Sequence, residues 1–235
     1  MRVIKHIPNT VTSMNLLSGI LGVIFALQGN IQTAFILLLG AACFDLCDGL
    51  AARLLGAYSE VGKELDSLSD LVSFGVLPAI MLYCATGSCG WICYIPLIIA
   101  VFSALRLAKF NLDERQHSGF LGLPTPACAM ICGSLACFAF SSPERILASL
   151  CHSCWFVPAL SIVLSLLLVS EIPMFSMKFG KDTVQDRRTG ILRIIFLTAA
   201  VLTICIVAAF RLHWSLTILI IFSIYIVMNI ISPKQ

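Results

Sequence analysis

The stretch that decides the fold begins Asp45-Leu-Cys-Asp48-Gly49-Leu-Ala-Ala52-Arg53 and continues to Gly62, Asp66 and Asp70. Its four aspartates form two pairs, three and four residues apart, and either spacing places both carboxylates on one face of a helix. The preceding run, residues 31–44, contains no charged residue. Two acidic helix faces are therefore expected to meet at the edge of a membrane, where an ionisable side chain is costly and usually functional.

Four clustered carboxylates repel one another unless a cation lies between them. Oxygen ligands alone suit Mg²⁺, Mn²⁺ or Ca²⁺ and do not favour zinc. Two such ions stabilise the attacking and leaving oxygens of a displacement at phosphorus. Gly49 and Gly62 leave room for a phosphate or nucleotide near the backbone, and Arg53 offers a planar fork for phosphate oxygens. A position at the membrane edge suits a lipid substrate.

The composition indicates an integral membrane protein. Of the 235 residues, 59% are hydrophobic and only 11% are charged, and the mean hydropathy is +0.99. A soluble domain has about 25% charged residues. The long apolar runs favour helices over a β-barrel, which would show short alternating segments. A net charge of +3 is too small to indicate nucleic acid as a partner.

The apolar runs predict an all-α, polytopic helical bundle with eight spans in one domain, residues 1–235. Six spans are expected to form the core, and the last two, within 191–231, to be peripheral. The predicted spans are 11–28, 32–54, 68–86, 91–110, 122–141, 155–170, 191–210 and 214–231.

Basic residues predict the orientation. If the N-terminus is cytoplasmic, all but two of the 15 basic residues fall on the cytoplasmic side, the exceptions being Arg145 and Arg211. Both termini and the aspartate stretch are then cytoplasmic. The first span is read as an uncleaved helix, because polar residues interrupt its start and no clear cleavage site follows.

Other interpretations of the acidic stretch fit its residues less well. A solvated helix–loop–helix with Glu60 and Glu64 explains Asp66 but not Asp45 or Asp48, which directly follow an apolar run. An ion channel or ion-coupled carrier needs polar groups across the whole bilayer, whereas the polar residues here gather at one side. Cys151 and Cys154 have the spacing of half a zinc site, but a second pair is missing, so inert cysteines or a loop disulfide are expected.

With these residues in view, the chain resembles the CDP-alcohol phosphatidyltransferase family. Its signature has the form D-x2-D-G-x2-A-R-x8-G-x3-D-x3-D, and residues 45–70 match all eight positions. Further segments resemble the branch that uses serine: residues 7–9, Asn15, residues 73–79, residues 106–111 and residues 122–127.

The resemblance implies a six-helix core with two more helices, a homodimer, and a site open to the cytoplasm. It implies that two divalent cations, Mg²⁺ or Mn²⁺, are held by Asp45, Asp48, Asp66 and Asp70, with Asp70 as general base. It implies a CDP-binding region that consists of Gly49, Ala52, Arg53, Gly62, Asn9 and Asn15.

The expected reaction transfers the phosphatidyl group of CDP-diacylglycerol to L-serine and releases CMP. Serine carries a carboxylate, which favours an Arg or Lys partner. The candidates for holding serine or the lipid phosphate are Arg106, Lys109, Asn111, Thr125 and Lys178. The basic residues near 178–188 also fit a rim that faces anionic headgroups.

The nearest alternative is the same chemistry with another alcohol, such as glycerol 3-phosphate or an inositol phosphate. The expected location is a bacterial inner membrane, with membrane lipids and a second copy of the chain as partners.

Overall fold

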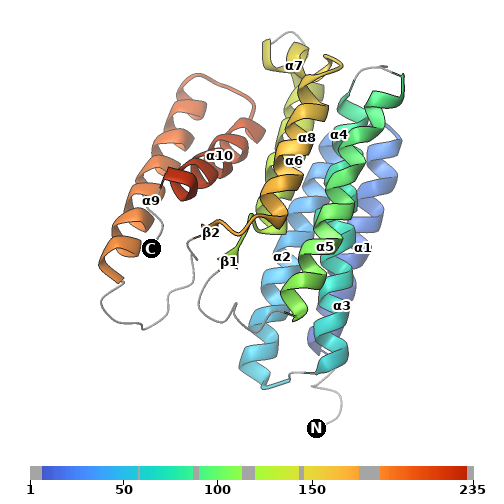
Figure 1. Cartoon of the computed structure of the whole chain (residues 1–235), viewed down its shortest axis with the longest axis vertical. Coiled ribbons are helices and arrows are strands. Elements are labelled where there is room, and N and C mark those ends of the chain that lie inside the picture. The colour runs from blue at the N-terminus through green and yellow to red at the C-terminus, as the bar shows by residue number, and fades with distance from the viewer. Residues whose placement is uncertain are drawn as a thin grey trace.

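The computed structural model describes residues 7–57, 59–86, 90–112, 120–142, 146–174 and 186–231. Almost all of them are helical, which confirms the all-α prediction (Figure 1). The helices are α1 (Ile7–Leu27), α2 (Ile31–Leu55), α3 (Glu60–Asp70), η2 (Leu71–Val76), α4 (Leu77–Ala85), η3 (Gly90–Leu97), α5 (Ile98–Leu112), α6 (Thr125–Ser141), α7 (Ile146–Cys151), α8 (Phe156–Val169), α9 (Asp186–Ala209) and α10 (Ser215–Ile231).

Two very short strands join the loops before α6 and after α8. β1 (Phe120–Leu121) pairs antiparallel with β2 (Pro173–Met174). The backbone N–H of Gly122, which has φ 75°, donates to the Ile172 carbonyl over 2.9 Å. Helix α6 therefore begins at Thr125, three residues later than the predicted span.

The first two helices form a tight hairpin because of specific turn chemistry. Gly29 has φ 82°, a left-handed conformation that favours glycine. Asn30 caps α2 by accepting a hydrogen bond from the Thr33 backbone N–H over 3.2 Å. At the other end, Gly56 closes α2 with φ 57°. Ser59 caps α3 by accepting from the Gly62 backbone N–H over 3.0 Å. The acidic ends of α2 and α3 are thus joined by a short, well-capped turn.

Helices α3, η2 and α4 form one continuous helix, Glu60–Ala85. The sequence predicted this span only from residue 68, because charged residues fill its first turns. Within it, Leu71–Val76 has the wider π-helical turn, a feature often found at functional sites. Its Ser73 hydroxyl donates to the Asn15 carbonyl over 3.0 Å, which ties the π segment to α1.

Helix α6 lies at the centre of the bundle and is buried along most of its length. Gly133 permits close contact with α2, because a Cβ there would lie 2.9 Å from a ring carbon of Phe35. Cys128, Cys132 and Cys137 are free and buried on α6. They pack as small hydrophobic side chains.

The C-terminal helices pack outside this core. Helix α10 contacts α6, and α9 packs mainly on α10 (Figure 1). Trp214, just before α10, stacks on Phe35 of α2 with ring centroids 5.3 Å apart. The last helix pair is therefore anchored to the bundle through α10.

Among the described residues, four helices are long and apolar enough to cross a membrane: Ile7–Leu27, Ile31–Leu55, Glu60–Ala85 and Gly90–Leu112. The other four predicted spans correspond to shorter apolar helices. The count of eight crossings and the cytoplasmic placement of both termini stay predictions. Cys151 is free and buried, whereas Cys154 is disulfide-bonded, so these two cysteines do not bridge each other.

Candidate active site

Three of the four aspartates come together between α2 and α3. Ligand oxygens of Asp45, Asp48 and Asp66 all lie within 4.8 Å of one another. The spacing of Asp45 and Asp48 places them on one face of α2, and α3 brings Asp66 to the same place. The two-face arrangement expected from the sequence is therefore present.

The environment of these carboxylates fits a divalent cation. Asp48 is only 6% exposed. Among the described residues, Asp48 Oδ2 and Asp66 Oδ1 are buried without a hydrogen-bond donor. Asp45 is also repelled by the other two carboxylates. Buried acceptors without donors are costly, and a cation with oxygen-ligand preference would satisfy all three side chains at once.

Asp70 lies one helical turn beyond Asp66 and has its own surroundings. Its Oδ1 accepts a hydrogen bond from Asn15 Nδ2 on α1 over 3.2 Å. It is close enough to Asp45 and Asp66 for their charges to repel, and to Arg106 for theirs to attract. Asp70 thus lies near both the three-carboxylate group (Asp45, Asp48 and Asp66) and the buried cation Arg106.

The residues expected to bind CDP differ in how closely other atoms surround them. Gly62 is tightly packed, since a Cβ there would lie 2.9 Å from both Asn9 Oδ1 and Ser59 Oγ. Gly49 has no neighbouring atom within 4 Å of a built Cβ, so its face of α2 is open to a ligand. Arg53 is exposed one turn further along α2.

Ala52 is half-buried on the same helix. Asn15 is fully buried, and its Oδ1 has no hydrogen-bond donor among the described residues. Asn15 therefore contacts Asp70, in addition to belonging to the predicted CDP-binding region.

Arg106 is the notable residue among the acceptor candidates. It is 9% exposed. Its Nη1 donates to the Thr125 hydroxyl over 2.7 Å, and its Nε has no acceptor among the described residues. No carboxylate of the described chain lies within ion-pair distance of it. A buried guanidinium held this way is suited to bind an anion from outside the protein.

The other acceptor candidates have different surroundings. Lys109 Nζ pairs with Glu171 Oε1 at 3.5 Å, and both side chains are at least half exposed. Asn111 Nδ2 donates to the Ser67 hydroxyl over 2.9 Å, which joins α5 to α3 beside Asp66. Lys178 lies outside the described residues.

Sequence reasoning missed Ser67, which accepts the hydrogen bond from Asn111 beside Asp66. Ser67 follows Asp66 directly and looked like an ordinary helix residue.

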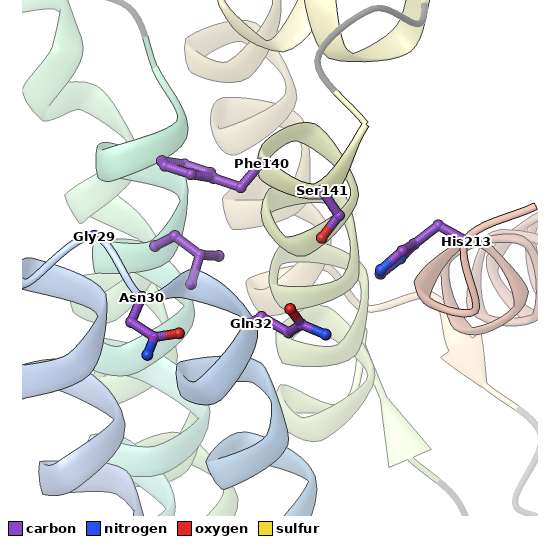
Figure 2. Close-up of a pocket in the computed structure, with 7 residues that line it drawn as sticks. Gly29, Asn30, Gln32, Phe140, Ser141 and His213 are labelled. Carbon is purple, nitrogen blue, oxygen red and sulfur yellow. The ribbon is translucent and has the colours of Figure 1, made fainter.

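A separate pocket of about 420 Å³ lies at the opposite end of the bundle. Figure 2 shows Gln32, Ser141 and His213 around it, from α2, α6 and the turn before α10. It is roughly 25 Å along α2 from the aspartates, at 1.5 Å per residue. This pocket is therefore not part of the acidic site.

Comparison with known proteins gives the site a context. The family model described as CDP-alcohol phosphatidyltransferase matches residues 5–169. A Methanocaldococcus jannaschii protein named CDP-diacylglycerol–serine O-phosphatidyltransferase is 31% identical over 224 residues, which cover 95% of this chain and 94% of that protein.

Two further relatives match less of the chain. A Mycobacterium leprae protein with the same name is 36% identical over 185 residues, 74% of this chain and 59% of that protein. The archaetidylserine synthase of Methanothermobacter thermautotrophicus is 37% identical over 140 residues, 58% of this chain and 60% of that protein. The chain thus spans about three fifths of the length of these two relatives.

Proposed function

The chain belongs to the CDP-alcohol phosphatidyltransferase family, and from this premise we propose that it transfers the phosphatidyl group of CDP-diacylglycerol to the hydroxyl of L-serine, which releases CMP. The observation that carries the proposal is the meeting of Asp45, Asp48 and Asp66 within 4.8 Å, with buried oxygens that lack donors. The names of the relatives support serine as the acceptor.

Asp45, Asp48 and Asp66 would hold the divalent metal, with Asp70 beside them as the fourth carboxylate that completes a two-ion site. Mg²⁺ or Mn²⁺ bound there would draw charge from the phosphate oxygens and help the leaving oxygen of CMP depart. The three carboxylates would fix the position of the reacting phosphate against α2 and α3.

Asp70 would accept the proton of the serine hydroxyl as that oxygen attacks the phosphorus bearing diacylglycerol. The hydrogen bond from Asn15 to Oδ1 leaves Oδ2 for this purpose and fixes the carboxyl plane. Arg106 is close enough to Asp70 for their charges to attract, and an amino-acid acceptor would approach between them. Its guanidinium would hold the serine carboxylate or the lipid phosphate.

The CDP moiety would lie along the open face of α2. Gly49 has free space around it, and Arg53 is exposed one turn further on. Ala52, Gly62, Asn9 and Asn15 belong to the same proposed region.

The apolar helices indicate a membrane protein, and the relatives include bacterial and archaeal proteins. We place the site on the cytoplasmic side of the cell membrane, from the distribution of basic residues. We also propose that the protein forms a homodimer, because the family resemblance implies one.

The acceptor is tested by CMP release from purified protein in detergent with CDP-diacylglycerol and Mg²⁺ or Mn²⁺. Serine, glycerol 3-phosphate and inositol phosphate are offered separately. Release with serine supports the proposal. Release only with one of the phosphorylated alcohols would keep the phosphatidyl transfer and remove serine. Folded protein that releases no CMP with any alcohol would contradict the enzymatic proposal and favour a carrier.

A further inference from the structure

The buried face of α5 lies against the continuous helix Glu60–Ala85. Two contacts fix how these helices are aligned. A Cβ at Gly75, in η2, would lie 3.1 Å from the Ser103 Cβ, and Asn111 Nδ2 donates to the Ser67 hydroxyl over 2.9 Å. The step from Ser103 to Asn111 along α5 therefore matches the step back from Gly75 to Ser67, which means that the two helices are antiparallel.

This alignment brings Arg106 to the level of Asp70. Arg106 lies one helical turn beyond Ser103 on α5, so it is opposite Val72, two positions from Asp70 in the sequence. At a rise of about 1.5 Å per residue, this offset is about 3 Å along the helix axis. The attraction between the charges of Arg106 and Asp70 agrees with this placement. The face of α5 that carries Ser103 and Arg106 thus borders the part of the site where Asp70 lies.

Two polar atoms on this face have no partner. The buried residues of α5 are Ile99, Ser103 and Arg106, and their spacing of four and three residues places them on one stripe. Ser103 is fully buried, and its hydroxyl has no hydrogen-bond partner among the described residues. The same is true of Arg106 Nε, whereas Arg106 Nη1 donates to Thr125 over 2.7 Å. Buried polar atoms without partners are rare and require an explanation.

The usual bonding of a helical serine does not explain Ser103. Ser67, Ser69 and Ser161 each donate to the carbonyl four residues earlier in the same helix, which satisfies the hydroxyl locally. The Ser103 hydroxyl makes no such bond. A carboxylate between Ser103 and Arg106 would accept from both donors, because they lie one helical turn apart on the same stripe.

The charges near this stripe favour an amino acid over a phosphate. Arg106 contributes one positive charge, and Asp70 contributes a negative charge that acts on it. Lys109, the other basic residue of α5, is paired with Glu171. A zwitterionic amino acid presents both signs of charge to Arg106 and Asp70, whereas a phosphate dianion beside Asp70 would require a second cation on α5.

We propose that Ser103 is a specificity-determining residue of the acceptor site, where its hydroxyl and the Arg106 guanidinium together hold the carboxylate of the amino-acid acceptor. This inference rests on the proposed function. Ser103 lies outside the signature at residues 45–70. Its place beside the site comes from the packing of α5 on η2, which local sequence does not reveal.

The test compares Ser103→Ala with wild-type protein in CMP release, with L-serine or L-serinamide as the acceptor. Ser103→Ala removes one hydroxyl and keeps the Cβ that packs against Gly75. Loss of a hydrogen bond to a charged carboxylate is expected to raise the KM for serine about tenfold. Serinamide presents a neutral carbonyl instead, so its KM should rise only about twofold. The KM for CDP-diacylglycerol and the kcat at saturating serine should stay close to the wild-type values.

Ser134→Ala is the matched control for the loss of a buried hydroxyl. Ser134 is also fully buried, but its hydroxyl donates to the Ile131 carbonyl of its own helix, α6, over 3.1 Å. This variant should keep the KM of both acceptors. Thermal unfolding of both variants reports any general loss of packing.

Four outcomes would overturn the inference. An unchanged serine KM in Ser103→Ala, with an active wild type, would remove Ser103 from the acceptor site and leave the proposed function standing. An equal rise in KM for serine and serinamide would place the hydroxyl against another part of the acceptor. A joint change of all constants with a lower unfolding temperature would show that Ser103 acts through packing. A wild type that releases no CMP with serine would overturn the proposed function, and this inference with it.

Discussion

At the scale of single residues, a change in the three-carboxylate group is expected to affect both stability and activity. Asp66→Asn removes one charge from a cluster whose members repel and one ligand from the proposed cation site. CMP release should fall at least about a hundredfold, as expected when the charge stabilisation of a transition state is lost. In metal-free buffer the variant should unfold at an equal or higher temperature than wild type, because repulsion is relieved.

Added Mn²⁺ should then raise the unfolding temperature of wild type and not of Asp66→Asn, since only bound ligand stabilises the folded state. Glu64→Gln is the matched control, because Glu64 is an exposed carboxylate on the same helix. That variant should behave as wild type in both measurements. Equal stabilisation of Asp66→Asn and wild type by Mn²⁺ would place the cation elsewhere.

A second prediction at this scale concerns Asn15. Asn15→Ala removes the donor to Asp70 Oδ1, a bond of 3.2 Å in a buried site. The base then loses its orientation, and kcat with serine should fall about tenfold to a hundredfold. The KM for serine should change little, because the Asn15 amide bonds Asp70 and not a residue proposed to hold serine. Steady-state CMP release measures both constants.

Asn30→Ala is the control for the loss of an amide side chain. Asn30 caps α2 at the far end of the helix, so its removal should cost about 1 kcal/mol of stability and leave kcat unchanged. If Asn15→Ala kept the kcat of wild type, the hydrogen bond to Asp70 would have no part in the reaction.

At the scale of helices, Gly62 of α3 is a packing glycine, whereas Gly49 of α2 is proposed to leave room for substrate. A Cβ at Gly49 meets no atom within 4 Å, whereas one at Gly62 meets Asn9 and Ser59 at 2.9 Å. Gly49→Ala should therefore stabilise the helix by up to about 1 kcal/mol through helix propensity. Its KM for CDP-diacylglycerol should nevertheless rise several-fold, because the methyl group occupies the face proposed for CDP.

Gly62→Ala should instead lower the unfolding temperature, because Asn9 and the Ser59 cap must move. Thermal unfolding and the CDP-diacylglycerol KM of the two variants distinguish these effects. A Gly49→Ala protein with the substrate constants of wild type would show that CDP does not lie against α2 at this point.

Hydropathy and spacing predicted the helices and the acidic faces, because both depend on residues near one another in sequence. The start of α3 at Glu60 was missed, since helix capping by Ser59 outweighs the polar character of its first turns. The π-helical turn at Leu71–Val76 was also missed. Within this turn Ser73 reaches the Asn15 carbonyl on α1, a contact across 58 residues that no local pattern encodes.

The candidate site, too, could be predicted from the sequence only where it depends on residues near one another in the chain. The aspartates could be predicted to converge because their spacing fixes a helix face. The bond between Asn15 and Asp70, and the bond between Arg106 and Thr125, arise only when separate helices pack together.

At the scale of the whole molecule, the orientation in the membrane can be tested directly. Eight crossings with both ends cytoplasmic place residue 235 inside and the turn between α9 and α10 outside. Green fluorescent protein fused after Gln235 should therefore fluoresce in intact bacterial cells, and a fusion after Leu212 should not. Fluorescence from the second fusion with none from the first would invert the proposed topology of the last two helices.

The central claim is that this family member uses a divalent cation at its aspartates to transfer a phosphatidyl group to serine. The most direct measurement is serine-dependent CMP release from purified, chelator-stripped protein during titration with Mn²⁺. We expect no release before metal is added and a saturable rise as Mn²⁺ binds. Undiminished CMP release from the stripped protein, with chelator still present, would contradict the claim.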